Sequence, residues 1–481
     1  MEWSPSPKRG RFLLSAGDSQ QMNREERAWM STKSSTFQAA ANLAKMCIGV
    51  GVLALPYSTA KGGLLFAPIV IAVIAAWNAE ACTMMMQCKD ALDMVSLPAD
   101  LSSTYSRIAY AGAGRMGVVV TDISIIITLM GVCIAYQITF AQLLQQIPWT
   151  TNSIGQLSII SGLVVFPLSC VHNVGLLASF SIVGMVCLIV SVAAILAFGF
   201  IYYGGVANPL DLENAHPLPL WPESLSNLTS FVGVSVFCFG LCSLAFPVEE
   251  SMQRRNEFPK AVLWCLIVVW VMYVVLGDVG AVLYVQAPSG IHDNILGNLP
   301  IDSAVALTVR LAMAGVSLLT YPLTLVPPAQ MIEHYLLCYT SSAIPEIAIK
   351  SASYGSIASY GSIAQDEESV IVRSRADSTS LLADPEVSLL CRVLCRLVLV
   401  IMTTFVAAFV PCFGMVISLL GGFTVTILSF ILPSYLHLQL VCDEGGRYSR
   451  QYWWDLVLTV VGTLMCVLAT GVQLQSGAKC A

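Results

Sequence analysis

Two apolar segments of the chain carry the same interruption, in the pattern Gly-x6-Pro. The first runs from Gly49 to Pro56 and the second from Gly240 to Pro247. Glycine loosens a helix because it has no Cβ, and proline removes a backbone N–H and clashes with the preceding turn. At membrane depth, broken backbone persists only where protein buries it or where it lines a cavity. The paired breaks therefore predict a central binding site.

The ends of a broken helix carry backbone N–H and C=O groups that can bind a charged ligand. Exposed N–H groups and the positive end of a half-helix dipole attract an anion. We expect the first break to bind a carboxylate through the backbone of Gly49, Val50, Gly51 and Val52. We expect carbonyls at the second break to accept hydrogen bonds from an ammonium group, at Phe237, Cys238, Phe239 and Gly240. The alternative for the glycines is close helix packing alone.

Polar side chains of other apolar segments are candidates for closing the site and for ion binding. Tyr136 or Gln137 would close the pocket, and the alternative for Tyr136 is a hydrogen bond between helices. Thr320 would offer its hydroxyl to a sodium ion bound by first-segment carbonyls. Its alternative is a bond to a carbonyl of its own helix.

Ionisable side chains inside a membrane are costly and therefore suggest a function. Lys45 lies one turn before the first break, where its ammonium group would take the place of a bound cation or titrate during proton coupling. Glu80 and Asp278 would pair with Lys45 or carry a proton themselves. The alternative for Lys45 is a static bond to a carboxylate or to helix carbonyls.

The composition is that of a membrane protein. Apolar residues make up 56% of the chain and charged residues 11%, with a mean hydropathy of +0.76. Charged residues usually make up about a quarter of a soluble domain. Apolar runs of roughly 20 residues are long enough to span the hydrocarbon. We count eleven, at 36–57, 63–87, 117–146, 154–171, 174–203, 227–247, 260–286, 303–327, 389–411, 413–438 and 453–475.

Along the chain, loops that contain several Lys and Arg residues alternate with loops that contain almost none. The N-terminal tail is also rich in Lys and Arg. The positive-inside rule therefore places the N-terminus in the cytosol and the C-terminus in the lumen or outside the cell. No apolar stretch precedes the first segment, so we expect no cleavable signal peptide. We predict a disordered cytosolic tail at 1–34, transmembrane helices 1–8 at 35–339 and a disordered cytosolic loop at 340–388. Helices 9–11 follow at 389–475, and an outer tail at 476–481 ends the chain.

The loop at 340–388 is rich in Ser and acidic residues, a composition that cannot bury a core. It contains two Tyr-x-x-apolar motifs, beginning at Tyr354 and Tyr360, and an acidic dileucine pattern formed by Asp377, Leu381 and Leu382. Such motifs predict sorting adaptors as partners and an endosomal, lysosomal or vacuolar membrane, and the alternative is a plain solvated linker. On the outer side, Asn227 begins a glycosylation sequon.

The segment from Asn42 to Tyr57 resembles the first-helix signature of the amino acid/auxin permease family, which includes proton-assisted, vacuolar and system A/N transporters. The resemblance covers residues 36–440 and continues at 172–179, 237–240, 247–252, 320–322 and 421–433. Proton-assisted members commonly carry His where this chain has Asn42, and Glu where it has Gly240. These departures leave the coupling ion, proton or sodium, open.

The resemblance implies an all-α membrane protein of about eleven transmembrane helices. These would form a five-plus-five inverted repeat of the LeuT/APC-like kind, in which helices 1 and 6 are discontinuous. It also implies secondary active transport of amino acids by ion-coupled symport, with the plasma membrane as the alternative to an acidic organelle.

Two other functions stay open. One is an amino-acid sensor of the same fold that signals through its cytosolic segments, and the other is a permease for another small zwitterion or an organic acid such as auxin. An enzyme is not expected, because the sequence has no Walker A motif, nucleophile elbow or Rossmann glycine pattern. We expect no cofactor and no nucleic-acid partner. We expect no metal site either, because the five histidines show no metal-ligand spacing.

Overall fold

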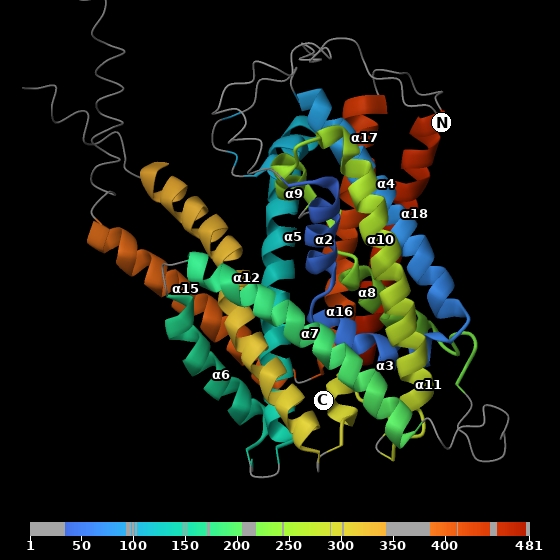
Figure 1. The fold of residues 1–481 in the computed structure, drawn as a ribbon. Coiled ribbons are helices and arrows are strands. Elements are labelled where there is room, and N and C mark those ends of the chain that lie inside the picture. The colour runs from blue at the N-terminus through green and yellow to red at the C-terminus, as the bar shows by residue number, and fades with distance from the viewer. Residues whose placement is uncertain are drawn as a thin grey trace, which may run out of the picture.

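The computed structural model describes most of the chain as a helical bundle (Figure 1). The described residues are 34–92, 98, 101, 103–147, 150, 152–170, 174–203, 218–242, 245–288, 290–300, 303–342, 385–410, 412–442 and 450–477. Within these ranges the only β-type contact is an isolated bridge between Ser34 and Met252. The sorting motifs at Tyr354, Tyr360, Asp377, Leu381 and Leu382 lie outside the described residues.

The first apolar segment is broken where the sequence predicts. Helix α2 (Thr36–Cys47) begins with a capping box, in which Ser35 and Gln38 satisfy each other's backbone N–H. It ends before Gly49, and the chain continues as the 3-10 helix η2 (Val50–Ala54) and helix α3 (Leu55–Gly62). The two halves meet at an angle of 53°.

The second predicted break is also present. Helix α8 (Leu225–Cys238) is capped by the Ser224 side chain and ends one residue before Phe239. Helix α9 (Ala245–Ser251) continues the segment after the break and contains Pro247. Both Gly-x6-Pro patterns thus mark interrupted helices, as predicted.

The other predicted segments each contain helix. These helices are α4 (Phe66–Ala91), α5 (Thr104–Gln145), α6 (Ile154–Ser169), α7 (Val174–Tyr202), α10 (Phe258–Val274), α11 (Gly280–Tyr284), α12 (Ala304–Ser342), α15 (Pro385–Phe409), α16 (Phe413–Leu420), α17 (Leu432–His437) and α18 (Arg450–Gly477). Short 3-10 helices lie at η5 (Arg255–Glu257) and η7 (Ile295–Asn298). By length and hydropathy, the described residues contain eight spans, or nine if the bent first pair counts as one. The count of eleven stays a prediction, because α6 and α8 are shorter than a full span.

Several boundaries differ from those that apolarity predicts. The range of α5 joins two helices across a kink at Gly114, where φ is 63°, so the helix after the kink begins close to the predicted residue 117. Helix α12 continues to Ser342 rather than ending at residue 327. Polar last turns lengthen α12, and hydropathy does not detect them. π-Helices also interrupt the seventh and tenth segments, at η6 (Val275–Val279), η8 (Gly421–Val425), η9 (Ile427–Ile431) and η10 (Leu438–Cys442).

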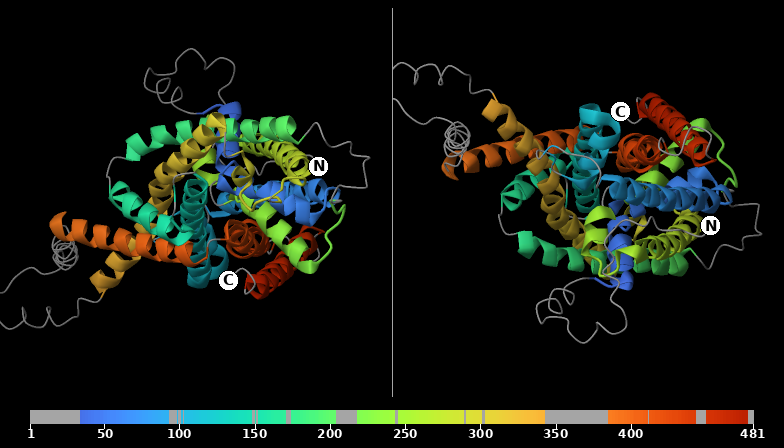
Figure 2. Two further views of the ribbon diagram at one scale, coloured as in Figure 1. Left: turned by 90° about the horizontal axis from the view of Figure 1, so that it is seen from below. Right: turned by 90° about the horizontal axis from the view of Figure 1, so that it is seen from above.

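The broken helices lie inside the bundle. Figure 1 shows α2, α3, α8 and α16 near its centre, with α4, α10 and α18 on one side and α6, α12 and α15 on the other. The end views show α5 between these two groups (Figure 2). Helices α12 and α15 diverge from the centre toward one end of the bundle, which Figure 1 shows at the top.

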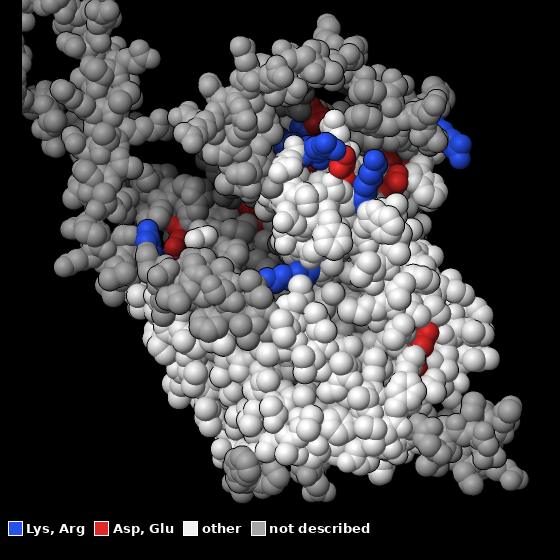
Figure 3. All heavy atoms as spheres, in the orientation of Figure 1, with Lys and Arg blue, Asp and Glu red and all other residues white. Residues whose placement is uncertain are grey.

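Charged side chains gather at that same end (Figure 3). We call it the basic end because it carries Lys89 and Arg255. Lys89 of α4 bonds to Glu249 at 2.6 Å and to Glu250 at 2.9 Å, and Arg255 lies 3.8 Å from Glu249. Burial raises the pKa of Glu250, but the hydrogen bond and charge of Lys89 and the nearby Thr104 and Arg255 outweigh it and hold the pKa below its usual range. This link between α4 and α9 therefore stabilises the fold at neutral pH and weakens only as the pH falls through that lowered value.

Helices α8 and α16 approach so closely that only glycine fits at the contact. A Cβ on Gly421 would lie 1.8 Å from the carbonyl oxygen of Gly233, and one on Gly233 would lie 2.2 Å from that of Ser418. Both obstacles are backbone atoms, which cannot rotate away. Small residues of this kind let transmembrane helices pack backbone to backbone.

We therefore expect Gly421→Ala to lower the free energy of unfolding by about 1–3 kcal/mol, the usual cost of overpacking. Gly471→Ala is the matched control, because a Cβ there meets nothing within 4 Å. Thermal denaturation in detergent, followed by size-exclusion chromatography, would measure both. An apparent melting temperature equally unchanged in the two variants would contradict this packing.

Candidate functional site

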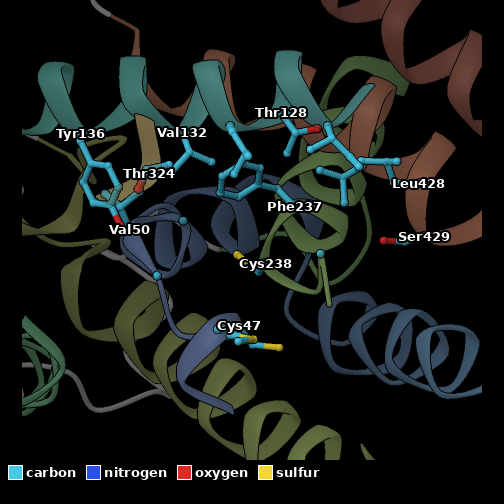
Figure 4. Close-up of a pocket in the computed structure, with 17 residues that line it drawn as sticks. Cys47, Val50, Thr128, Val132, Tyr136, Phe237, Cys238, Thr324, Leu428 and Ser429 are labelled. Atoms are coloured by element: carbon cyan, nitrogen blue, oxygen red, sulfur yellow. The ribbon is translucent and has the colours of Figure 1, made fainter. Parts of the chain in front are cut away.

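A cavity of about 260 Å³ lies between the two breaks (Figure 4). Its wall is formed by the ends of α2 and α8, by one face of α5, and by single turns of α12, η8 and η9. The lining residues are Met46, Cys47, Gly49, Val50, Gly51, Ile125, Thr128, Leu129, Val132, Tyr136, Phe237, Cys238, Gly240, Thr324, Val425, Leu428 and Ser429. Most of the predicted substrate-binding residues are therefore brought together here.

Two of those predicted residues lie elsewhere. Val52 is fully buried one turn into η2, where its side chain packs in the core rather than at the cavity. Phe239 is also fully buried, with its ring edge-on to that of Tyr273 at 5.0 Å between centroids. Val52 lies in the helical turn after the first break, whereas Phe239 is the C-cap residue of α8 at the second break.

The first break presents unpaired donors. Gly49 N–H donates to the Cys47 carbonyl at 2.9 Å, and Val52 N–H donates to the Gly49 carbonyl at 3.2 Å. For the N–H groups of Val50 and Gly51, the described part of the chain offers no acceptor. Both residues line the cavity at the start of η2. An anion placed there would satisfy two donors that otherwise stay orphaned.

The carbonyls of the second break are already in use. Phe237 accepts a bond from Gly240 N–H at 3.2 Å, and Phe239 accepts one from Leu241 N–H at 2.6 Å. Cys238 accepts a bond from the Tyr273 hydroxyl at 2.9 Å. Because a carbonyl has two lone pairs, an ammonium group would share these acceptors rather than find them free.

Tyr273 joins the two breaks. This residue of α10 is fully buried, and its hydroxyl lies 2.7 Å from the Cys47 carbonyl and 2.9 Å from the Cys238 carbonyl. These carbonyls end α2 and α8, where helices leave acceptors unpaired. Sequence reasoning missed Tyr273, because nothing local distinguishes it from other aromatic residues in an apolar segment.

The remaining polar groups of the cavity are uncharged hydroxyls and thiols. Thr128 of α5 donates to Thr424 of η8 at 2.7 Å, and Figure 4 shows Tyr136 near Thr324 on the side of Val50. No Asp, Glu, Lys, Arg or His is among the residues that line the cavity.

The two sides of the cavity differ. Met46 of α2 lines the cavity and is itself 42% exposed, so one part of the cavity wall reaches the surface of the molecule. At the end opposite the basic end, Ile295 and Leu296 of η7 are fully buried. Beside them, Asp293 accepts bonds from Gly414 N–H at 3.2 Å and from the Gln142 amide at 3.4 Å. The loop containing η7 thus closes that end against α5 and α16.

The predicted ion-coupling residues are scattered rather than clustered. Lys45 is half-buried beside Met46 and has no carboxylate partner in the described ranges. Thr320 faces α7, where its hydroxyl would lie 3.8 Å from a Cβ on Gly184. One turn further along α12, Thr324 lines the cavity instead, although its hydroxyl bonds to the Thr320 carbonyl at 3.1 Å.

The two predicted carboxylates do not meet Lys45. Glu80 is exposed on the outer face of α4, away from the cavity lining. Asp278 is half-buried in η6, and its Oδ1 has no hydrogen-bond partner in the described part of the molecule. Neither side chain lines the cavity, so their roles in coupling stay predictions.

Two other candidate residues sit in structured surroundings. The amide of Gln137 donates to the Thr404 hydroxyl of α15 at 2.9 Å, which makes it a link between helices rather than a pocket residue. Asn227 lies in the first turn of α8, and Thr229 of the same sequon is buried and accepts a bond from Gln473 at 3.2 Å. Glycan acceptors lie in surface loops, so this placement disfavours the sequon.

An apolar cavity between two broken helices, inside a multi-pass bundle, is the arrangement of a membrane transporter's central binding site. Residues 32–475 match the family described as transmembrane amino acid transporter protein. The chain therefore belongs to this family, and the predicted relationship is confirmed. Members of the family are transporters and not enzymes.

Individual relatives agree with this assignment. The chain is 24% identical to the amino acid transporter ANT1 of Arabidopsis thaliana over 442 residues, covering 91% of this chain and 92% of the relative. It is 24% identical to vacuolar amino acid transporter 6 of Saccharomyces cerevisiae, covering 82% and 88%. It is also 24% identical to the sodium-coupled neutral amino acid transporter 7 of Rattus norvegicus, covering 89% and 84%.

Among solved structures, the inward facing conformation of Mhp1 aligns with a TM-score of 0.51 at 13% sequence identity. The alignment covers 94% of this chain and 91% of that one. At this identity the likeness concerns the fold alone, and it supports the predicted class of transporter fold.

We expect Thr324→Trp to abolish amino acid uptake, because an indole there would occupy the cavity of about 260 Å³. Thr308→Trp is the control on the same helix, since Thr308 is exposed and remote from the cavity lining. Uptake of labelled amino acids into proteoliposomes would compare the two. Full uptake by the Thr324 variant would exclude this cavity as the binding site.

Proposed function

We propose that the protein is an ion-coupled symporter of small neutral amino acids. The observation that carries the proposal is the pair of N–H groups at Val50 and Gly51, which lack an acceptor in the described part of the chain and belong to residues that line a largely apolar cavity. A free amino acid always carries a carboxylate, and its charge is costly to place in hydrocarbon without such partners. The ammonium group would bind among the carbonyls of the second break and the cavity hydroxyls.

The lining favours neutral side chains. A cationic or acidic substrate would bring a second charge into a cavity whose wall contains no ionised side chain to pair with it. An unpaired charge in such surroundings is strongly disfavoured. The volume of about 260 Å³ lies just below the usual range for small-molecule pockets, which suits a ligand the size of one amino acid.

The closure of one end of the cavity supports a direction of substrate release. If the basic end faces the cytosol, as the positive-inside rule predicts, η7 closes the cavity on the side away from the cytosol. On that basis we infer an inward-facing state from which substrate is released to the cytosol. A vacuolar or lysosomal membrane fits this direction, and the yeast relative is named for the vacuole.

Two groups beside the cavity are candidates for ion coupling, Lys45 of α2 and a hydroxyl of α12. Lys45 lies beside the cavity on α2, so its ammonium group would act where a sodium ion would otherwise sit or would titrate during the cycle. The rat relative is named as sodium-coupled, which favours the second candidate, a sodium ion between α2 carbonyls and a hydroxyl of α12. Thr324 is better placed for that role than Thr320, because it lines the cavity.

Substrate selectivity tests the proposal directly. We expect proteoliposomes containing the protein to accumulate small neutral amino acids at least about tenfold more than Lys, Arg, Asp or Glu, because about 1.4 kcal/mol of desolvation already gives that ratio. Preferred uptake of Lys or Arg would contradict the neutral cavity. Saturable binding without flux would favour the sensor, and flux of auxin but not of amino acids would favour the other permease.

Two ion gradients and two variants distinguish proton coupling from sodium coupling. For proton coupling, we expect a protonophore to collapse accumulation whether or not sodium is present, and Lys45→Met to abolish the pH dependence while substrate still binds. For sodium coupling, we expect accumulation to require sodium and Thr324→Val to raise the sodium concentration for half-maximal uptake. Lys61→Met is the control, because Lys61 bonds to Tyr57 at the opposite end. Accumulation that ignores both gradients would exclude symport.

A further inference from the structure

A buried polar cluster lies at the basic end, apart from the substrate cavity. His437 ends α17, Cys442 ends η10, and Asp455 lies in α18. His437 and Asp455 are fully buried and Cys442 is 5% exposed. Their ligand atoms all lie within 4.8 Å of one another. The sequence predicts no metal cluster, and the fold brings one set of metal-ligating side chains together nonetheless.

The distances come close to those of a coordination sphere. The Cys442 thiol lies 3.2 Å from Asp455 Oδ2 and 3.8 Å from His437 Nδ1. Tetrahedral zinc with bonds of about 2.0 Å to N or O and about 2.3 Å to S would hold such atoms about 3.5 Å apart. His437 Nδ1 and Asp455 Oδ2 lie 2.6 Å apart and would separate to about 3.3 Å on binding.

The surroundings also match a metal site. His437 Nε2 lies 2.5 Å from the Oε1 of Gln87 in α4, which leaves Nδ1 to face Asp455 and Cys442. A metal-bound histidine usually donates its other ring N–H to an oxygen in this way. Asp455 Oδ1 is buried and has no hydrogen-bond partner in the described residues. Cys88, the residue after Gln87, is fully buried and close enough to interact electrostatically with Asp455 and Cys442.

We propose that His437 Nδ1, Cys442 Sγ and the Asp455 carboxylate bind a Zn²⁺ ion. One thiolate and one imidazole favour zinc over calcium or magnesium, which take oxygen ligands. The bound ion would fasten α18 to α17 and α4 at the basic end. This site is separate from substrate binding, so its failure would leave the proposed transport function untouched.

Metal titration of the purified full-length protein tests the proposal. After removal of metals with a chelator, we expect the wild type to bind about one equivalent of Co²⁺, a probe for zinc, with a thiolate-to-cobalt charge-transfer band. Cys442→Ser should lose that band, and Asp455→Asn should weaken binding by about 10-fold or more. Cys466→Ser is the matched control, because this buried thiol of α18 donates to the Phe423 carbonyl at 3.8 Å and does not belong to the cluster.

X-ray absorption at the zinc edge gives a test that needs no variant to fold. The wild type with one equivalent of Zn²⁺ should show sulfur at about 2.3 Å and nitrogen or oxygen at about 2.0 Å. Absence of binding in the wild type, or an equal loss in Cys442→Ser and Cys466→Ser, would overturn the proposal and leave a hydrogen-bonded His437–Asp455 pair.

Discussion

The fold depends on how the unpaired backbone N–H and C=O groups are accommodated where two helices end inside the membrane. A backbone polar group left unpaired in hydrocarbon costs several kcal/mol, so a break must be either satisfied or put to use. The structure does both. The Tyr273 hydroxyl lies within hydrogen-bonding distance of the terminal carbonyls of α2 and α8, and these share its single proton. In the described part of the chain, the N–H groups of Val50 and Gly51 have no acceptor, and both residues line the cavity.

Tyr273 also fixes the geometry of the site. One hydroxyl that contacts both helix ends holds them at a fixed separation, and α10 supplies it from outside the cavity. The ring of Phe239 packs edge-on against the ring of Tyr273, so the second break is held by both its carbonyl and its side chain. The cavity is consequently a product of three helices that meet at one phenol rather than of either break alone.

Glycine performs a second task away from the cavity. The backbone of α8 meets that of α16 and η8 at Gly233 and Gly421, and this contact brings Val425, Leu428 and Ser429 to the cavity wall. The π-helices of the tenth segment shift the register of that wall, because each adds a residue to a turn. The packing of α8 against α16 and η8 therefore decides which side chains of the tenth segment line the cavity.

The sequence alone determined the class of protein and the positions of the two helix breaks that border the candidate site. Gly49, Pro56, Gly240 and Pro247 act on the backbone of their own segments, so their effect is local and can be read from spacing. The family resemblance and the backbone at Gly49 and Gly51 follow from the same local signals. The predicted end of α12 was less accurate, because a search for apolar runs does not detect the polar last turns of a helix.

Only the tertiary structure decided which side chains meet. Tyr273 and Thr324 join the site, Thr320, Gln137 and Glu80 face elsewhere, and His437 meets Cys442 and Asp455. These outcomes depend on the rotation of each helix about its axis. In an all-apolar helix no amphipathic face reveals that rotation, so it is set by contacts between segments far apart in the sequence.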